Sequence, residues 1–148
     1  MRFMIILKSD AASESGAPPP PEIFQAMGAF NEELVRAGVM LAGEGLHPTS
    51  KGARVVFDGD DVSVIDGPFA ETKEIVAGFW IIQVRSKEEA IEWVKRIGTH
   101  MKAAGAPPAR GETVEIRQVA EIEDFGDDIP AEERDREVRL RAEIEASR

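Results

Sequence analysis

The stretch VSVIDGPFAETKEIVAGFWIIQVR, residues 62–85, contains two apolar segments joined by a charged loop. Both segments are rich in β-branched or aromatic residues, which predicts a β-strand on each side of the loop. An Asp-Gly pair alone can turn a hairpin, yet here the chain uses about ten residues. Four charged side chains lie in this loop: Asp66, Glu71, Lys73 and Glu74. The loop therefore holds more charge than a simple turn requires.

Further strands and helices follow from hydrophobic periodicity along the chain. Strands are predicted at residues 2–8, 39–46, 53–58, 62–66, 78–85 and 113–119. One amphipathic helix is predicted over residues 22–37, with Gly38 as its stop signal. A second helix is predicted to begin at the capping box Ser86–Glu89 and to end at Gly98, which places His100 in a surface loop. Residues 9–21, rich in Ser, Ala and Pro, are predicted to be a loop.

The order of these elements, β-α-β-β-β-β-α-β, predicts an α+β fold. When residues 53–66 are treated as an inserted hairpin, the remainder is a ferredoxin-like split β-α-β pattern, with two helices on one face of an antiparallel sheet. The other face would then be bare. Since the segment FWIIQV (79–84) is apolar on both sides, we expect a second subunit to cover that face and predict a homodimer.

The last thirty or so residues differ from the rest in charge. Residues 120–148 hold 11 of the 28 acidic residues but only 5 of the 18 basic ones. We therefore predict a domain over residues 1–119 and an appendage over 120–148, made of an acidic linker and a charged helix that starts near Pro130. A solvated appendage and a helix that binds a protein partner are both compatible with this pattern.

Composition excludes several classes of function. The net charge of −10 disfavours nucleic acid and anionic membranes as partners, because both require a basic surface. No apolar run approaches the roughly 20 residues of a membrane helix, and the apolar run near Met1 is too short for a secretory signal, so a cytoplasmic location is predicted. With no cysteine in the chain, disulfides and thiolate sites are impossible.

The charged loop has two interpretations. It could be a structural clamp, in which Asp66 caps the turn and Lys73 pairs with Glu71 or Glu74. It could instead be a polar site, because opposite charges held together shift one another's pKa and position a ligand. Glu44 and His47 could lie beside the loop, but they supply only two metal ligands, so neither a metal nor an organic cofactor is predicted.

Three motifs connect the chain to a known family. DGPFAETKE (66–74), the following Gly78-Phe79 pair and AGEGL (42–46) resemble the DGPF branch of the YCII-related proteins, which are small bacterial proteins of the dimeric α+β barrel superfamily. The resemblance runs from Met1 to about Val119, and the tail resembles an extension of some members. It implies a ferredoxin-like subunit, two sheets paired into a barrel, and a cleft near the motif.

The resemblance says less about activity. Some members are linked to extracytoplasmic-function sigma factors, and a His-Asp pair is associated with the related YciI proteins. The helix predicted over residues 22–37 has no histidine, so this chain departs from the YciI pattern.

Two hypotheses about function follow. In the first, the chain is a cofactor-independent enzyme for a small molecule, with Asp66 or Glu71 as general acid or base and Lys73 stabilising an enolate or oxyanion. The ligand contacts would come from Glu44, His47, Phe69 and Glu74. In the second, the chain is a non-catalytic protein that binds a metabolite or regulates a partner, for example a sigma factor.

Overall fold

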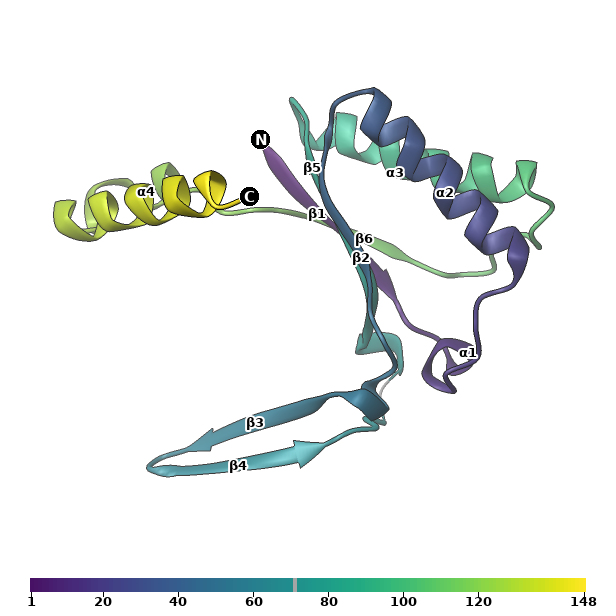
Figure 1. Cartoon of the computed structure of the whole chain (residues 1–148), viewed down its shortest axis with the longest axis horizontal. Helices are drawn as coiled ribbons and strands as arrows, with labels where there is room; N and C mark the ends of the chain where they lie inside the picture. Colours follow the sequence, from purple (N-terminus) through teal and green to yellow (C-terminus); the bar gives the residue numbers. More distant parts are fainter. Residues whose placement is uncertain (71) are drawn as a thin grey trace. The chain divides into compact units, whose positions relative to one another are not determined.

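The computed structural model describes residues 1–70 and 72–148. The chain forms two compact units, Met1–Gln118 and Val119–Arg148 (Figure 1). No helix among the described residues has the length and apolar character needed to cross a lipid bilayer.

The first unit is built on a four-stranded antiparallel sheet. Its strands are β1 (Arg2–Lys8), β2 (Met40–Gly45), β5 (Val76–Gln83) and β6 (Val114–Gln118), in the order β2-β5-β1-β6. This is the ferredoxin-like order, with the first strand and the strand before the second long helix at the centre. The predicted α+β fold is confirmed.

Two long helices cover one face of this sheet. Helix α2 (Pro21–Arg36) and helix α3 (Lys87–Ala103) lie side by side on that face (Figure 1). The core between the helices and the sheet contains Phe3, Ile5, Phe30, Leu34, Trp80 and Ile82, all buried. The indole Nε1 of Trp80 donates a hydrogen bond to Oδ1 of Asn31 over 2.7 Å, which satisfies the polar atom of an otherwise apolar side chain.

Helix α3 is longer than predicted. It continues through Gly98 and ends at Ala103, where Gly105 adopts a left-handed φ of +79°. Amide hydrogens of Gly105 and Ala106 donate to the carbonyls of Lys102 and Met101, which is a Schellman motif. A glycine inside a helix costs only about 1 kcal/mol of stability relative to alanine. The packing of the turn that follows Gly98 is sufficient to offset this cost. The prediction that the helix ends at Gly98 is wrong, and His100 is helical.

The segment predicted as a loop between β1 and α2 contains a short helix, α1 (Ala11–Glu14). Asp10 caps it by accepting a hydrogen bond from the amide of Ser13 over 2.7 Å. This bond to the ionised carboxylate is the main cause that lowers the pKa of Asp10 below its ordinary value. The four-residue helix gave no periodic signal in the sequence, because it is shorter than two turns.

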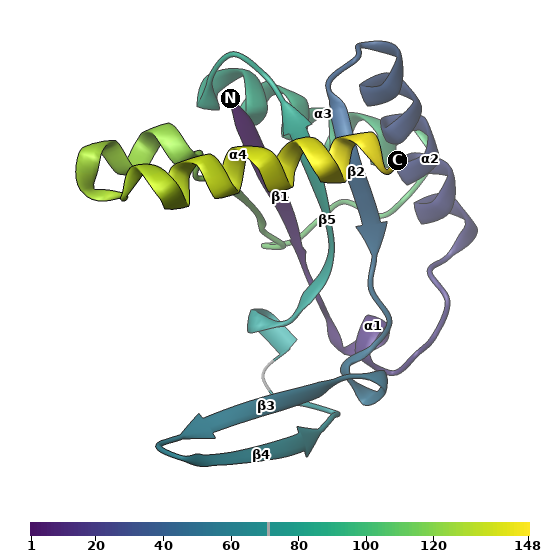
Figure 2. The ribbon, with the colours of Figure 1, turned by 60° about the vertical axis from the view of Figure 1, so that its left-hand side comes forward.

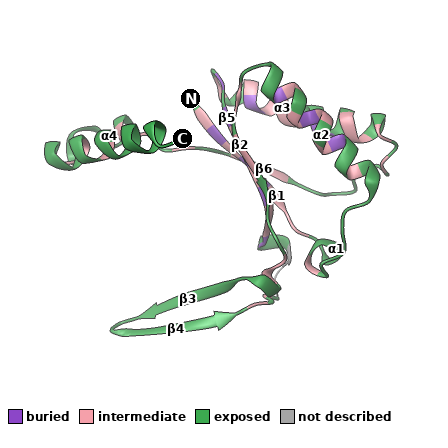
Figure 3. Ribbon diagram, viewed as in Figure 1, coloured by how far each residue is buried: buried purple, intermediate pink, exposed green. Residues whose placement is uncertain are grey.

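The inserted hairpin is a separate two-stranded ribbon. Strands β3 (Ala53–Asp58) and β4 (Asp61–Asp66) pair only with each other, around a turn in which Gly59 has a φ of +61°. Every residue of both strands is exposed (Figure 3). The ribbon extends beyond the end of the four-stranded sheet in both views of the chain (Figures 1 and 2).

The sheet face opposite the helices is apolar at its centre. The strand register places Ala42, Ile81 and Met4 in one row across the sheet, and Glu44, Phe79 and Ile6 in the next. Among residues 1–70 and 72–118, no helix or strand covers this face. We call the four side chains at its centre, Met4, Ile6, Phe79 and Ile81, the open face.

The second unit contains a 3-10 segment, η3 (Ile122–Asp128), and helix α4 (Ala131–Ala146). No residue of α4 is buried, and ion pairs such as Arg141–Glu137 join side chains one turn apart on its surface. Such exposed pairs contribute only about 0.3–0.5 kcal/mol each.

Candidate functional site

The DGPF segment is fixed to the chain by its backbone. The amide of Gly67 donates to the carbonyl of Gly52 over 3.0 Å, which ties the end of the ribbon to its beginning. At Gly67 there is no room for a side chain, because an added Cβ would lie 1.7 Å from the carbonyl oxygen of Thr49. This close approach explains why the motif has a glycine at that position.

Thr49 is the centre of the attachment. It lies in η1 (Thr49–Lys51), and its hydroxyl accepts a hydrogen bond from the amide of Phe69 over 3.0 Å. The same hydroxyl donates to Oε2 of Glu14 over 2.6 Å, and the amide of Thr49 donates to Oε1 of Glu14 over 3.1 Å. Three segments far apart in the sequence are thus joined at one side chain.

A cation–π contact completes the attachment. The guanidinium of Arg54, on β3, lies 3.7 Å from the centre of the Phe69 ring, within the range at which such contacts stabilise a structure. Phe69 is half-buried, and its described contacts hold the loop in place. We call Glu14, Thr49, Arg54, Gly67 and Phe69 the clamp. It was not predicted from the sequence beyond Phe69 and the turn glycine, since Glu14 and Thr49 belong to no motif.

The charged side chains of the motif have a different environment. Asp66 is the last residue of β4 and is exposed, and in the described part of the chain its carboxylate accepts no hydrogen bond. Lys73 and Glu74 lie in η2 (Thr72–Glu74) and are exposed. No ion pair joins Lys73 to Glu74 or to another residue within 1–70 and 72–148. Glu71 lies outside the described residues.

The loop after β2 begins beside the start of β5. The amide of Leu46 donates to the carbonyl of Ala77 over 2.8 Å, which holds residues 44–47 next to the start of β5. Glu44 and His47 are both exposed. Among the described residues, no three side chains of His, Asp or Glu are close enough together to hold a metal ion.

A second polar cluster lies between α2 and α3, where none was predicted. Oε2 of Glu33 lies 2.6 Å from Nε2 of His100, and Oε1 of Glu33 pairs with the guanidinium of Arg96. The hydrogen bond from Arg96, followed by that from His100, lowers the pKa of Glu33, and Glu33 in turn raises the pKa of Arg96. His100 is half-buried here and is not in a surface loop. Arg96 and His100 are four residues apart, a spacing that places two side chains on the same face of a helix. The sequence would have indicated this pair if the predicted helix had continued past Gly98.

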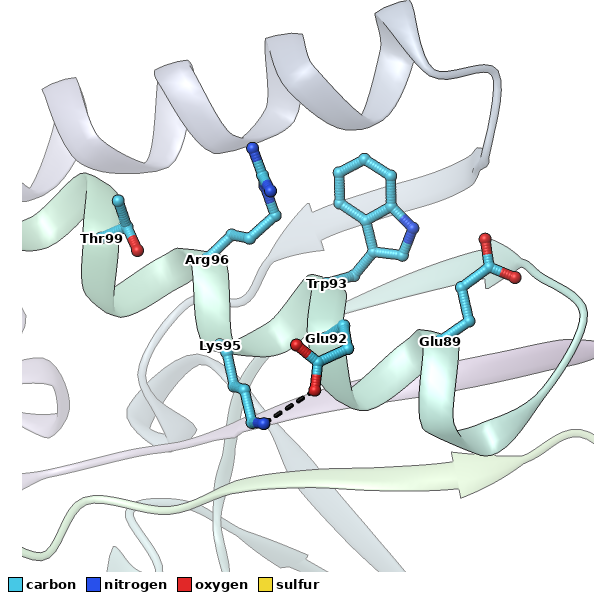
Figure 4. Close-up of a pocket in the computed structure, with 6 residues that line it drawn as sticks. All are labelled: Glu89, Glu92, Trp93, Lys95, Arg96 and Thr99. Carbon is cyan, nitrogen blue, oxygen red and sulfur yellow. Dashed lines mark hydrogen bonds and ion pairs between the residues drawn. The ribbon is translucent and has the colours of Figure 1, made fainter.

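Two open hollows adjoin this cluster. One, of about 300 Å³, is lined by side chains of α3 that include Trp93 and Arg96, both directed toward α2 (Figure 4). The other, of about 360 Å³, includes Glu33, Arg36 and His100. The described residues of the DGPF motif line neither hollow. Because Glu33 already uses both oxygens to join the helices, the cluster is best explained as a tie between α2 and α3.

Comparisons with known proteins agree with this architecture. The model of the YCII-related domain family matches residues 1–123. An uncharacterised protein of Rhizobium meliloti (strain 1021) is 30% identical over 88 residues, which cover 60% of this chain and 71% of that protein. The residues matched by the family model include the sheet, both long helices, the ribbon and the clamp. The chain therefore belongs to the YCII-related domain family.

Proposed function

We propose that this chain is a non-catalytic binding protein that acts as a homodimer, in which the DGPF segment is a structural clamp. The observation that carries the proposal is the division of roles within the motif. Gly67 and Phe69 are engaged in close intramolecular contacts, whereas Asp66, Lys73 and Glu74 are exposed and line neither hollow. A catalytic carboxylate usually needs a shielded environment or a charged partner to adjust its pKa.

The open face supports the homodimer. Met4, Phe79 and Ile81 are only half-buried, whereas Ile6, which pairs with Phe79 in the sheet, is buried. A contiguous apolar surface of this kind marks an interaction site in soluble proteins. Charged residues, such as Glu44 on β2 and Glu115 on β6, lie at the edges of the same rows, which is the arrangement of an apolar interface centre with a polar rim.

Catalysis at the motif is the second candidate, and one observation favours it. The hydrogen bonds at Leu46 and Gly67 bring the loop after β2 and the DGPF segment to the same end of the sheet. Glu44, His47, Asp66, Lys73 and Glu74 would then surround the mouth of a barrel formed by two sheets. In that case Asp66 or Glu71 would act as general acid or base, and Lys73 would stabilise a developing oxyanion.

Sedimentation velocity tests the homodimer, and a thermal-shift screen tests the role of the motif. Sedimentation velocity on the wild type and on Ile81→Arg should show a dimer and a monomer, respectively, because a buried arginine without a partner is costly. Val35→Arg is the matched control, since Val35 is 63% exposed on α2, and it should remain dimeric. A monomeric wild type would refute the homodimer.

A thermal-shift screen with a metabolite library separates binding from catalysis. A ligand that binds only the folded protein raises its melting temperature. We expect ligands to stabilise the wild type, Asp66→Ala and Lys73→Ala alike. If a ligand stabilises the wild type but neither variant, and is also converted to a product by the wild type alone, the catalytic candidate replaces the binding one.

A further inference from the structure

The ribbon formed by β3 and β4 has one apolar face. Its register pairs Val55 with Val64 and Phe57 with Val62, and alternation along each strand places these four side chains on the same face. Val55 is 52% exposed, Phe57 77%, Val62 60% and Val64 64%. The opposite face is more polar, with Arg54, Asp58, Asp61 and Ser63 among its side chains. We call Val55, Phe57, Val62 and Val64 the ribbon face.

The ribbon face is large for an exposed surface. Since a fully exposed aromatic side chain presents roughly 200 Å² and a valine somewhat less, these four present on the order of 400 Å². Patches of about 300–600 Å² are the largest that typical monomers expose, and many of them are functional. A two-stranded hairpin is also marginally stable in water when nothing packs against it. The ribbon therefore needs a partner surface.

The clamp holds the ribbon in a defined position. The hydrogen bond between Gly67 and Gly52 closes its base, and Arg54 on β3 packs on the ring of Phe69. The ribbon leaves the sheet on the side of the open face, away from α2 and α3 (Figure 1). An arm that is already ordered loses less conformational entropy when it binds.

We propose that the ribbon is an arm that packs its apolar face against the sheet of a second copy of this chain. This inference rests on the homodimer proposed above and names the surface that the homodimer uses beyond the open face. Within the described residues of Met1–Gln118 the chain has both an arm and an apolar sheet face that no helix or strand of this unit covers, and these two surfaces do not meet. A two-fold axis brings each arm to the other chain's sheet and covers both surfaces at once.

The size of the surface also favours a second copy. Two ribbon faces present together on the order of 800 Å², about half of the roughly 1,600 Å² of a standard stable interface. The two open faces are available for the remainder. A different protein would have to match both the arm and the sheet, whereas a second copy supplies both surfaces in equal number.

The test compares two double variants of the full chain. Phe57→Thr with Val64→Thr alters the ribbon face, and Val56→Thr with Ile65→Thr makes the same type of change on the opposite face. Threonine keeps a high β-propensity, so the ribbon itself remains folded. Sedimentation over a range of concentrations should show the dimer dissociation constant raised at least about tenfold by the first variant and less than about threefold by the second.

A crosslinking measurement provides a second readout. Because the chain has no cysteine, Val62→Cys offers a unique thiol for a photo-crosslinking label. We expect crosslinks to peptides of β1 or β5 from the other chain, identified by mixing isotopically labelled and unlabelled protein. Crosslinks confined to the same chain would refute the arm.

The two proposals fail in different ways. If Ile81→Arg dissociates the dimer while both ribbon variants have the wild-type dissociation constant, the homodimer is supported and the arm is refuted. If the wild type is a monomer at every concentration, the homodimer and the arm are both refuted.

Discussion

Replacement of Thr49 by valine tests whether the clamp stabilises the fold. The change removes a hydroxyl that accepts a hydrogen bond from the amide of Phe69 at 3.0 Å and donates one to Glu14 at 2.6 Å. The volume of the side chain is nearly unchanged, so the result reports on hydrogen bonding and not on a cavity. Thr49 and Glu14 are both half-buried, so water can replace the lost bonds only in part.

The magnitude follows from the two bonds. A hydrogen bond between neutral groups contributes about 0.5–1.5 kcal/mol, and one to a charged group about 1.5–3 kcal/mol. Glu14 keeps its bond from the amide of Thr49 and remains accessible to water, so its contribution falls toward the lower limit. We expect Thr49→Val to lower the free energy of unfolding by about 2 kcal/mol, which corresponds to a decrease in melting temperature of about 4–8 °C for a chain of this length.

Tryptophan fluorescence during urea unfolding measures this change in the relevant unit, because Trp80 and Trp93 both lie in the unit Met1–Gln118. Thr49→Ser is the matched control, since serine keeps the hydroxyl and loses only a methyl group. It should retain most of the wild-type stability. If Thr49→Val and Thr49→Ser unfold at the same urea concentration, the hydrogen bonds of the clamp do not stabilise the fold and the structural role of the motif is refuted.

Three more predictions concern single residues. Gly98→Ala should stabilise the chain by about 0.5–1 kcal/mol, because Gly98 is inside α3 with open space around it; a loss of stability would mean that the helix ends there. Gly67→Ala should destabilise the fold by about 1–3 kcal/mol, because the added methyl group clashes with the carbonyl of Thr49. Gly45→Ala is the control and should be tolerated, since no atom lies near an added Cβ there. Equal unfolding midpoints of the two variants would contradict the close approach at Gly67. The pKa of Glu33 in the folded chain is lowered from its ordinary value of 4.5, so ionised Glu33 stabilises the fold at pH values above 4.5, and this stability is lost as the pH falls through the lower folded pKa. Below about pH 4.5, the unfolding midpoint should therefore fall more steeply with decreasing pH in the wild type than in Glu33→Gln. Parallel pH profiles of the two proteins would contradict this prediction.

Some parts of the candidate site could be predicted and others could not. The turn residues Asp66 to Pro68 are recognisable in sequence, because Gly and Pro have specific backbone requirements. The attachment of Phe69 to Thr49 and Glu14 is not recognisable, since hydrogen bonds between residues 20 and 35 positions apart leave no local pattern. The pair of Glu33 and His100, 67 positions apart, was missed for the same reason, and because the end of α3 was placed at the wrong glycine.

The sequence predicted the order of the strands and of the two long helices, and with it the α+β fold, because periodicity and capping are properties of neighbouring residues. It also determined that one sheet face would remain apolar, since FWIIQV has no polar alternation. The folded structure was needed to show that Gly67 and Phe69 form a clamp, that the ribbon stands apart from the sheet with its apolar face exposed, and that His100 packs against Glu33. Those features depend on contacts between distant segments, which exist only after the backbone has brought the segments together.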